Sequence, residues 1–173
     1  MPNPSLDNER ALQTYFGTPH WHERQMFFDM GMSRLSRTDL FSHSPLVVPV
    51  KTEGRTYGVL SRIAAERWGE IPRVAYACTE VREHAGVTVV YLAFWKDDDA
   101  THQFGTFAAH VIQSTRACVM AARRKGIEKL WMPVLGGNRW EDALPLMEWT
   151  LEATADEAEE RGVPQPDVSI VRI

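Results

Sequence analysis

An apolar run that ends in two glycines stands at residues 129–140, which read KLWMPVLGGNRW. Residues 129–134 are short and almost continuously apolar, which is typical of a strand buried inside a parallel sheet. Gly136 and Gly137 then allow a tight turn. Residues 141–161 carry apolar side chains at helical spacing and are followed by a glycine, so they predict a long helix. The stretch therefore indicates a buried strand, a glycine turn and a helix, which is the repeating unit of an α/β protein.

The same alternation of strands and helices continues on both sides of this stretch. Short apolar runs predict strands, and helical spacing that stops at a glycine predicts helices. The expected strands are residues 45–50, 74–78, 87–95 and 168–173, and the expected helices are residues 57–68 and 104–124. Strands that alternate with helices favour an α/β fold, a three-layer α/β/α sandwich with a mixed, mostly parallel central sheet.

The chain has 173 residues, which is the length of one domain. We interpret residues 1–173 as a single domain with its α/β core at residues 32–173. Residues 1–31 are polar and then aromatic, and they form an N-terminal extension that covers either the sheet or a partner.

The charge balance argues against a nucleic-acid-binding surface. The chain has 19 Lys and Arg against 23 Asp and Glu, which gives a net charge of −4. Proteins that bind the phosphate backbone usually carry a basic stripe. The dense basic cluster of Arg123, Arg124 and Lys125 stands at the expected end of a helix, where positive charge complements the helix dipole. We therefore predict no nucleic-acid groove.

Other sequence features predict a cytoplasmic protein without a membrane anchor. No apolar run approaches the roughly 20 residues of a membrane helix, and the first residues lack a secretory signal pattern. Cys78 and Cys118 stand in apolar surroundings, so we expect reduced thiols in the core. His20 and His22 lack a third ligand, so no metal site is predicted, and no cofactor is implied.

Two glycine-containing loops each follow a buried strand and lead into a helix. Loop one is residues 51–58, KTEGRTYG, and loop two is residues 136–140, GGNRW. In open α/β sheets, ligands bind beyond the carboxyl ends of the strands. Glycines there let backbone N–H groups approach a ligand, and the N-terminus of the following helix favours a phosphate. The alternative is that these glycines only make tight turns.

The order of these segments resembles that of the macro domains, the ADP-ribose-binding modules. In that family a Gly-Asp-Ile/Leu segment precedes a strand that ends in Asn-Pro-x-Asn, and a later strand leads through Pro-x-x-Gly into a phosphate loop. The matching residues here are 37–41 (RTDLF), 46–54 (LVVPVKTEG), 57–70 and 130–137 (LWMPVLGG). Residues 140–148, WEDALPLME, are most similar to the subgroup that serves as antidotes to DNA ADP-ribosylating toxins. The resemblance implies a macro-like fold and a cleft for ADP-ribose or a related adenine nucleotide.

The resemblance also implies roles for individual residues. Asp39 would accept a hydrogen bond from the adenine amino group, with the Leu40 backbone nearby. Loop one would face the distal ribose and the diphosphate, and loop two would wrap the phosphates through its backbone. Trp95 would stack on a ribose or on adenine. The implied binding residues are Asp39, Leu40, Lys51, Thr52, Gly54, Gly58, Val59, Trp95, Gly136, Gly137, Asn138, Arg139 and Trp140.

Both loops depart from the family pattern. Lys51 replaces the asparagine that many active members place on the distal ribose, and loop two is shorter than the usual glycine-rich run. The positively charged side chain of Arg139 would then bind a phosphate in place of the missing backbone amides. Lys51 has three possible interpretations. It would contact a phosphate or a ribose, or act in hydrolysis as a lysine with a lowered pKa, or lie on the surface without a role in the site. Glu53 is either a base on water, or a ribose contact, or a solvated loop charge.

Three functions are consistent with these residues. The first is a reader domain that binds ADP-ribose or a related adenine nucleotide at the carboxyl ends of the strands. The second is a hydrolase that removes ADP-ribose from a protein or a nucleic-acid base, with Lys51 or Glu53 as the candidate catalytic residue. The third is a protein-interaction domain that kept the fold and lost the pocket, with Arg139 folded into the cleft. The implied partners are the nucleotide itself and, for the first two functions, an ADP-ribosylated macromolecule.

Overall fold

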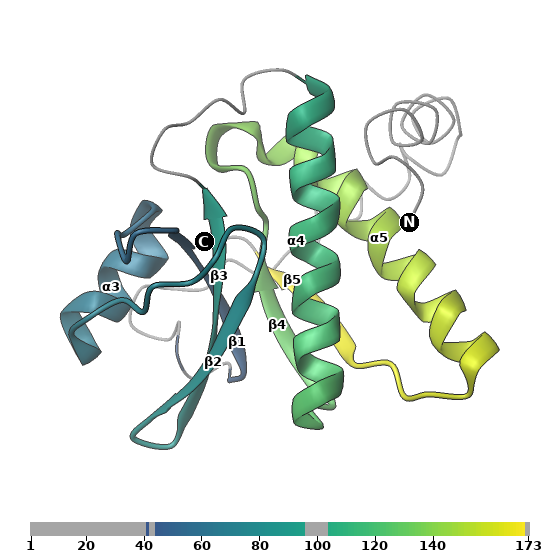
Figure 1. Ribbon diagram of the computed structural model, residues 1–173, viewed down its shortest axis with the longest axis horizontal. Helices are drawn as coiled ribbons and strands as arrows, with labels where there is room; N and C mark the ends of the chain where they lie inside the picture. The colour runs from purple at the N-terminus through teal and green to yellow at the C-terminus, as the bar shows by residue number, and fades with distance from the viewer. Residues whose placement is uncertain (1–40, 42–43, 96–103, 172–173) are drawn as a thin grey trace.

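The computed structural model describes residues 41, 44–95 and 104–171 of the chain. Within these residues a five-stranded sheet has the strand order β2-β3-β1-β4-β5 and is flanked by helices (Figure 1). The strands are β1 (Leu46–Lys51), β2 (Thr79–His84), β3 (Val87–Trp95), β4 (Lys129–Pro133) and β5 (Asp167–Val171). The helices are α3 (Gly58–Trp68), α4 (Phe104–Lys125), the 3-10 turn η2 (Gly137–Arg139) and α5 (Trp140–Arg161).

The sheet is mixed and mostly parallel, as the sequence predicted. The strand β1 pairs in parallel with β3 and β4, and β4 pairs in parallel with β5. The strand β2 is antiparallel to β3 and closes one edge as a hairpin through Ala85 and Gly86. Because the crossovers between parallel strands contain helices, both faces of the sheet are covered.

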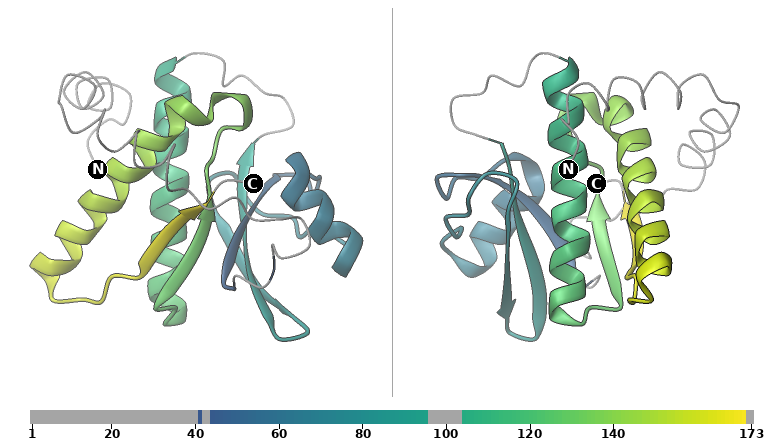
Figure 2. Two further views of the ribbon diagram at one scale, coloured as in Figure 1. Left: turned by 180° about the vertical axis from the view of Figure 1, so that it is seen from behind. Right: turned by 45° about the vertical axis from the view of Figure 1, so that its right-hand side comes forward.

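The three layers follow from the alternation of side chains along the strands. Val47 and Leu92 belong to a core cluster that α4 and α5 cover. Their neighbours Val48 and Ala93 belong to a second cluster, which α3 covers on the opposite face. Figure 2 shows α3 on one side of the sheet and the long pair α4 and α5 on the other. The predicted α/β/α sandwich is thus confirmed for the described residues.

Most expected elements are found within one or two residues of their predicted ends, but the strand predicted at 74–78 is wrong. That segment is irregular, with a turn closed by a hydrogen bond from Cys78 N to Ala75 O and a left-handed Ala77. The strand lies instead at Thr79–His84. Its charged side chains are tolerated because β2 is an edge strand that pairs on one side with β3. Val74 is nevertheless buried, in the cluster beneath α3.

The two cysteines differ in exposure, which corrects the expectation that both lie in the core. Cys118 is fully buried on α4, whereas Cys78 is exposed beside the turn that precedes β2. Burial raises the pKa of the Cys118 thiol far above its usual range, so this thiol stays protonated in the folded protein. Cys78 was misjudged because its apolar neighbours form a turn rather than a buried strand.

This difference predicts two separable thiol reactivities. At neutral pH a disulfide reagent is expected to modify Cys78 quickly, and Cys118 at least about a hundredfold more slowly, since Cys118 reacts only after local opening. The measurement is the time course of thiol release with and without denaturant. Cys78→Ser should remove the fast phase and leave the slow one. Equal rates for the two thiols in the wild-type protein would contradict the burial of Cys118.

The basic cluster lies at the end of α4, where the sequence placed it. The Arg123 guanidinium donates to Thr154 O at 2.8 Å and to Gln165 Oε1 at 2.6 Å. Arg123 therefore joins α4 to α5 and to the segment before β5. This contact supports the interpretation of the cluster as a structural one.

Residues 1–40 lie outside the described residues. The N-terminal extension and the single-domain interpretation of residues 1–173 therefore stay predictions. The part of the chain that the structure describes contains no helix that is both long and apolar enough to cross a membrane.

Candidate functional site

A cavity of about 290 Å³ opens at the carboxyl ends of the parallel strands. It lies between β1 and β4, beside the start of α3 and below loop two. The lining residues are Pro49, Tyr57, Val59, Leu60, Phe94, Pro133, Val134, Leu135, Gly136, Gly137 and Trp140. Among the described residues that line the cavity none carries a charged side chain, so none of these side chains repels an anion.

Two prolines explain why the sheet opens at this point. Trp131 N donates to Pro45 O at 2.9 Å, and Leu46 opposite Trp131 is the one residue pair between β1 and β4. A continued parallel ladder would next need an N–H at Pro133 and an N–H at Pro49. Neither proline has one, so the ladder stops and the strand ends separate around the cavity.

Loop two is built on two left-handed glycines. Gly136 has φ +96° and Gly137 has φ +55°, conformations that side chains other than glycine adopt rarely. The first hydrogen bonds of the helical segment run from Arg139 N to Gly136 O at 2.9 Å and from Trp140 N to Gly137 O. The N–H groups of Gly137 and Asn138 precede these bonds and have no acceptor within the helix. They are the donors that a phosphate at this helix start would use.

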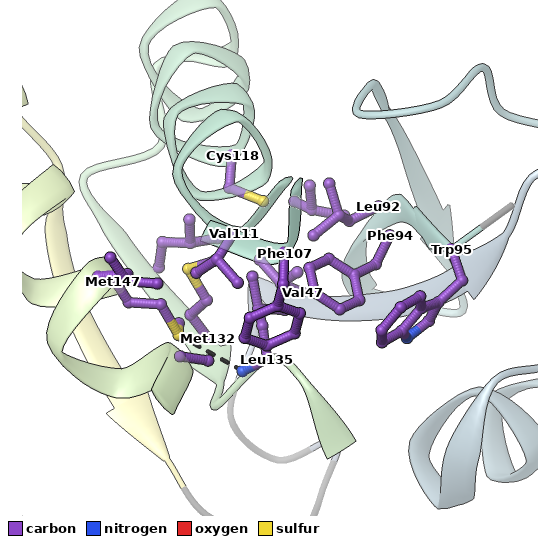
Figure 3. Close-up of a cluster of buried hydrophobic side chains, with 14 of the residues drawn as sticks. Val47, Leu92, Phe94, Trp95, Phe107, Val111, Cys118, Met132, Leu135 and Met147 are labelled. Carbon is purple, nitrogen blue, oxygen red and sulfur yellow. Dashed lines mark hydrogen bonds between the residues drawn. The ribbon is translucent and has the colours of Figure 1, made fainter. Parts of the chain in front are cut away.

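Close packing fixes the position of loop two. A Cβ atom on Gly136 would lie 2.9 Å from Phe107 Cζ and 3.2 Å from Ala143 Cβ. Leu135 N donates to Met147 Sδ at 3.4 Å, a contact that Figure 3 shows as a dashed line. The loop is therefore held against α4 and α5 at its base, and Gly137 at its tip is exposed.

The Arg139 side chain packs against Phe107 on α4 and lies close to Asp142 on α5. Its guanidinium lies 3.9 Å from the centroid of the Phe107 ring, and its Nε lies 3.4 Å from Asp142 Oδ2. Arg139 does not line the cavity in this arrangement. Its predicted contact with a phosphate stays a prediction, and it would require the side chain to leave Phe107.

Loop one turns away from the cavity at its tip. Thr52 N donates to Trp95 O at 3.0 Å, which ties the start of the loop to the end of β3. Glu53 is exposed and lies 3.8 Å from Arg73, and a Cβ on Gly54 would meet Ile71 O at 3.1 Å. The loop-one tip is thus packed on the segment that follows α3.

The structure brings together four of the predicted binding residues as cavity lining: Val59, Gly136, Gly137 and Trp140. Lys51 lies half-buried at the end of β1, and Gly58 opens α3 next to Val59. Lys51, Thr52, Glu53, Gly54 and Gly58 do not line the cavity. Asp39, Leu40 and the side chain of Asn138 lie outside the described residues. No ion pair engages the Lys51 ammonium among the described residues.

Trp95 is set behind the cavity wall. Its side chain is 8% exposed and belongs to the core cluster shown in Figure 3. The ring of Tyr57 stands 5.2 Å away, centroid to centroid, and Tyr57 lines the cavity where Trp95 does not. Trp95 therefore offers no free face for stacking in this arrangement, and its predicted stacking role stays a prediction.

Sequence reasoning missed three residues that shape the cavity: Pro49, Pro133 and Tyr57. The prolines carried a signal, because proline inside an apolar run that reads as a central strand contradicts a complete hydrogen-bond ladder. Tyr57 had no comparable signal. Its importance comes from a contact across the cleft, where a Cβ on Gly137 would lie 2.6 Å from the Tyr57 hydroxyl oxygen.

The described residues contain no cluster of three or more His, Cys, Asp or Glu side chains that could hold a metal ion. His20 and His22, whose spacing was considered in the sequence, lie outside the described residues.

Comparison with known proteins was made for both sequence and structure. No family model matches the sequence, and no curated protein matches it. Among solved structures, the macrodomain of Mycobacterium tuberculosis DarG is similar, with a TM-score of 0.51 and 15% sequence identity. The similarity covers 82% of this chain and 97% of that one. This likeness and the mixed, mostly parallel sheet between helices show that the chain has the macrodomain fold.

Proposed function

We propose that this protein binds ADP-ribose or a related adenine nucleotide in the cavity between β1 and β4 and acts as a reader. The observation that carries the proposal is the cavity itself. It lies at the carboxyl ends of parallel strands and is bordered by left-handed Gly136 and Gly137 at a helix start. This is where open α/β sheets bind nucleotides, and the macrodomain fold of the chain agrees with it.

The chemistry of the cavity suits a phosphate that is joined to a ribose or a base. The N–H groups of Gly137 and Asn138 and the helix dipole of α5 supply fixed positive potential without a lysine or arginine in the lining. Phe94, Leu135 and Trp140 supply apolar surface for a ribose or a base. Asp39 and Leu40 would complete the adenine end, as the family resemblance implies.

The alternative is a hydrolase that removes ADP-ribose from a protein or a nucleic-acid base. Lys51 keeps this alternative open, because it lies at the end of β1, at the same sheet edge as the cavity, with no ion pair among the described residues. Glu53 is the weaker candidate because it faces Arg73 at the far side of loop one. Hydrolysis would require Lys51 to reach the scissile ribose bond.

Calorimetric titration with ADP-ribose tests the proposal. The wild-type protein is expected to bind with micromolar affinity, and Asp39→Ala should weaken binding at least about tenfold because it removes the acceptor for adenine. Lys51→Ala is the matched test of the alternative. A reader releases no ADP-ribose from a modified substrate, with Lys51 or without it. No heat with ADP-ribose, AMP or NAD would contradict the proposed function, and turnover that Lys51→Ala abolishes would favour the hydrolase.

A further inference from the structure

Two observations at the cavity wall have no role in the function proposed so far. The first is the contact across the cleft, where Tyr57 at the start of α3 touches the backbone of Gly137 so closely that a Cβ there would lie 2.6 Å from the tyrosine oxygen. The second is the indole nitrogen of Trp95. It is buried and has no hydrogen-bond partner among the described residues.

The Tyr57–Gly137 contact limits the length of the cavity. Tyr57 at the end of loop one and Gly137 in loop two stand close together and both line the cavity, so the Tyr57 ring forms a wall at this point. The cavity of about 290 Å³ is partly open to solvent and lies near the lower end of the range for small-molecule sites. A nucleotide with two riboses joined by a diphosphate is a large ligand for a cavity of this volume. It therefore requires more of the cleft than the Tyr57 wall leaves open.

The Trp95 indole lies directly behind this wall. Tyr57, Phe94, Phe107 and His110 surround the ring, at centroid distances of 5.2, 4.8, 6.4 and 5.6 Å. Of these, Phe94 is fixed in the sheet, whereas Tyr57 stands at a helix start and is half-buried. In Figure 3 the indole nitrogen, drawn in blue, is turned away from the Phe94 ring. A buried N–H without an acceptor costs free energy, so an arrangement that gives the Trp95 N–H an acceptor is favoured.

We propose that Tyr57 is a movable wall and that its outward rotation brings the Trp95 indole N–H into the cleft, where it donates to a ligand oxygen. The acceptor belongs to the second ribose-phosphate half of the ligand, the half that AMP lacks. Tyr57 then determines which ligand lengths are accepted, and Trp95 is a direct hydrogen-bonding residue through its edge rather than through its face. This inference rests on the proposed function.

Nuclear magnetic resonance of the indole N–H groups tests, without any ligand, whether the Tyr57 ring shields Trp95 from solvent. The Trp95 resonance is assigned from its absence in Trp95→Phe. In the wild-type protein this proton is expected to exchange slowly with solvent. Tyr57→Ala should accelerate its exchange at least about tenfold, and Tyr57→Phe, which keeps the ring, should leave it unchanged. Unchanged exchange in Tyr57→Ala would overturn the proposal.

Titration with ADP-ribose and AMP tests the hydrogen bond. ADP-ribose should move the Trp95 indole proton downfield, and AMP should not. Trp95→Phe is expected to weaken ADP-ribose binding about fivefold, the value of one neutral hydrogen bond, with little effect on AMP. Tyr57→Ala should raise the preference for ADP-ribose over AMP by about threefold or more. Thermal unfolding of each variant confirms that it is folded, and the ratio of the two affinities is independent of the folded fraction.

The outcomes separate this inference from the proposed function. ADP-ribose binding that shifts the loop-two amides but leaves the Trp95 indole unmoved would overturn the inference and keep the function. Equal weakening of ADP-ribose and AMP in Trp95→Phe would overturn it as well. Absence of ADP-ribose binding in the wild-type protein would overturn both.

Discussion

Gly136→Ala is expected to destabilise the protein by about 2–4 kcal/mol and to abolish ligand binding in the cleft. Two costs add. A left-handed φ of +96° is strained for alanine, and the new Cβ would lie 2.9 Å from Phe107 Cζ and 3.2 Å from both Ala143 Cβ and Arg139 O. Phe107 and the backbone there are buried and packed, so they cannot move away cheaply.

Gly162→Ala is the matched control for this prediction. Gly162 also has a left-handed φ, of +64°, but a Cβ there meets nothing within 4 Å. The control variant should therefore lose only the stability that the left-handed backbone of an alanine costs, about 1 kcal/mol, and it should keep its ligand binding. Chemical denaturation gives the free energy of unfolding of both variants. Equal destabilisation by the two substitutions would show that loop two is not packed as described.

Phe107→Ala is expected to lower the free energy of unfolding by about 3–5 kcal/mol, which is more than Gly136→Ala lowers it. Phe107 is fully buried, contacts the base of loop two and carries the Arg139 guanidinium 3.9 Å from its ring centroid. Its removal would leave a cavity beneath loop two and would free Arg139 from a cation–π contact.

The measurement is again chemical denaturation, with two comparisons. Phe107→Leu keeps most of the volume and should cost less than about half as much. Val163→Ala removes an exposed side chain, at 41% exposure, and should change the stability by less than about 0.5 kcal/mol. A cost for Phe107→Ala below that of Phe107→Leu would contradict the role of Phe107 as the support of loop two.

The fold could be predicted from the sequence wherever apolar pattern and burial coincide. The strand β3 is found at its predicted residues because Val89–Trp95 is buried on both faces and its sequence is correspondingly apolar throughout. The strand β2 could not be predicted in the same way. It pairs with β3 alone, so Arg82 and Glu83 can stay exposed, and its pattern resembles a charged loop.

The backbone conformation of the candidate site could be predicted from the sequence, whereas the positions of its side chains were less predictable. The glycines of loop two mark a backbone conformation, and Gly136 and Gly137 are left-handed in the structure. Side-chain positions depend on contacts between segments far apart in the sequence. Arg139 lies on Phe107, Glu53 faces Arg73 and Tyr57 touches Gly137, and none of these pairs follows from spacing along the chain.

Two prolines in the sequence mark the position of the cavity. Pro49 and Pro133 each interrupt an apolar run in a central strand of the sheet. Because a proline nitrogen cannot donate, two neighbouring strands that both contain one must separate there. The position of the cavity between β1 and β4 is therefore encoded in two residues outside both glycine loops.

The central claim is that loop two binds the phosphates of an adenine nucleotide through its backbone. Backbone amide resonances recorded during titration with ADP-ribose test this most directly. The account predicts that the largest shifts fall on the amides of Gly136, Gly137 and Asn138, with smaller ones at Val59 and Trp140. Saturable shifts confined to another surface, such as the groove beside Cys78 and Arg124, would contradict it.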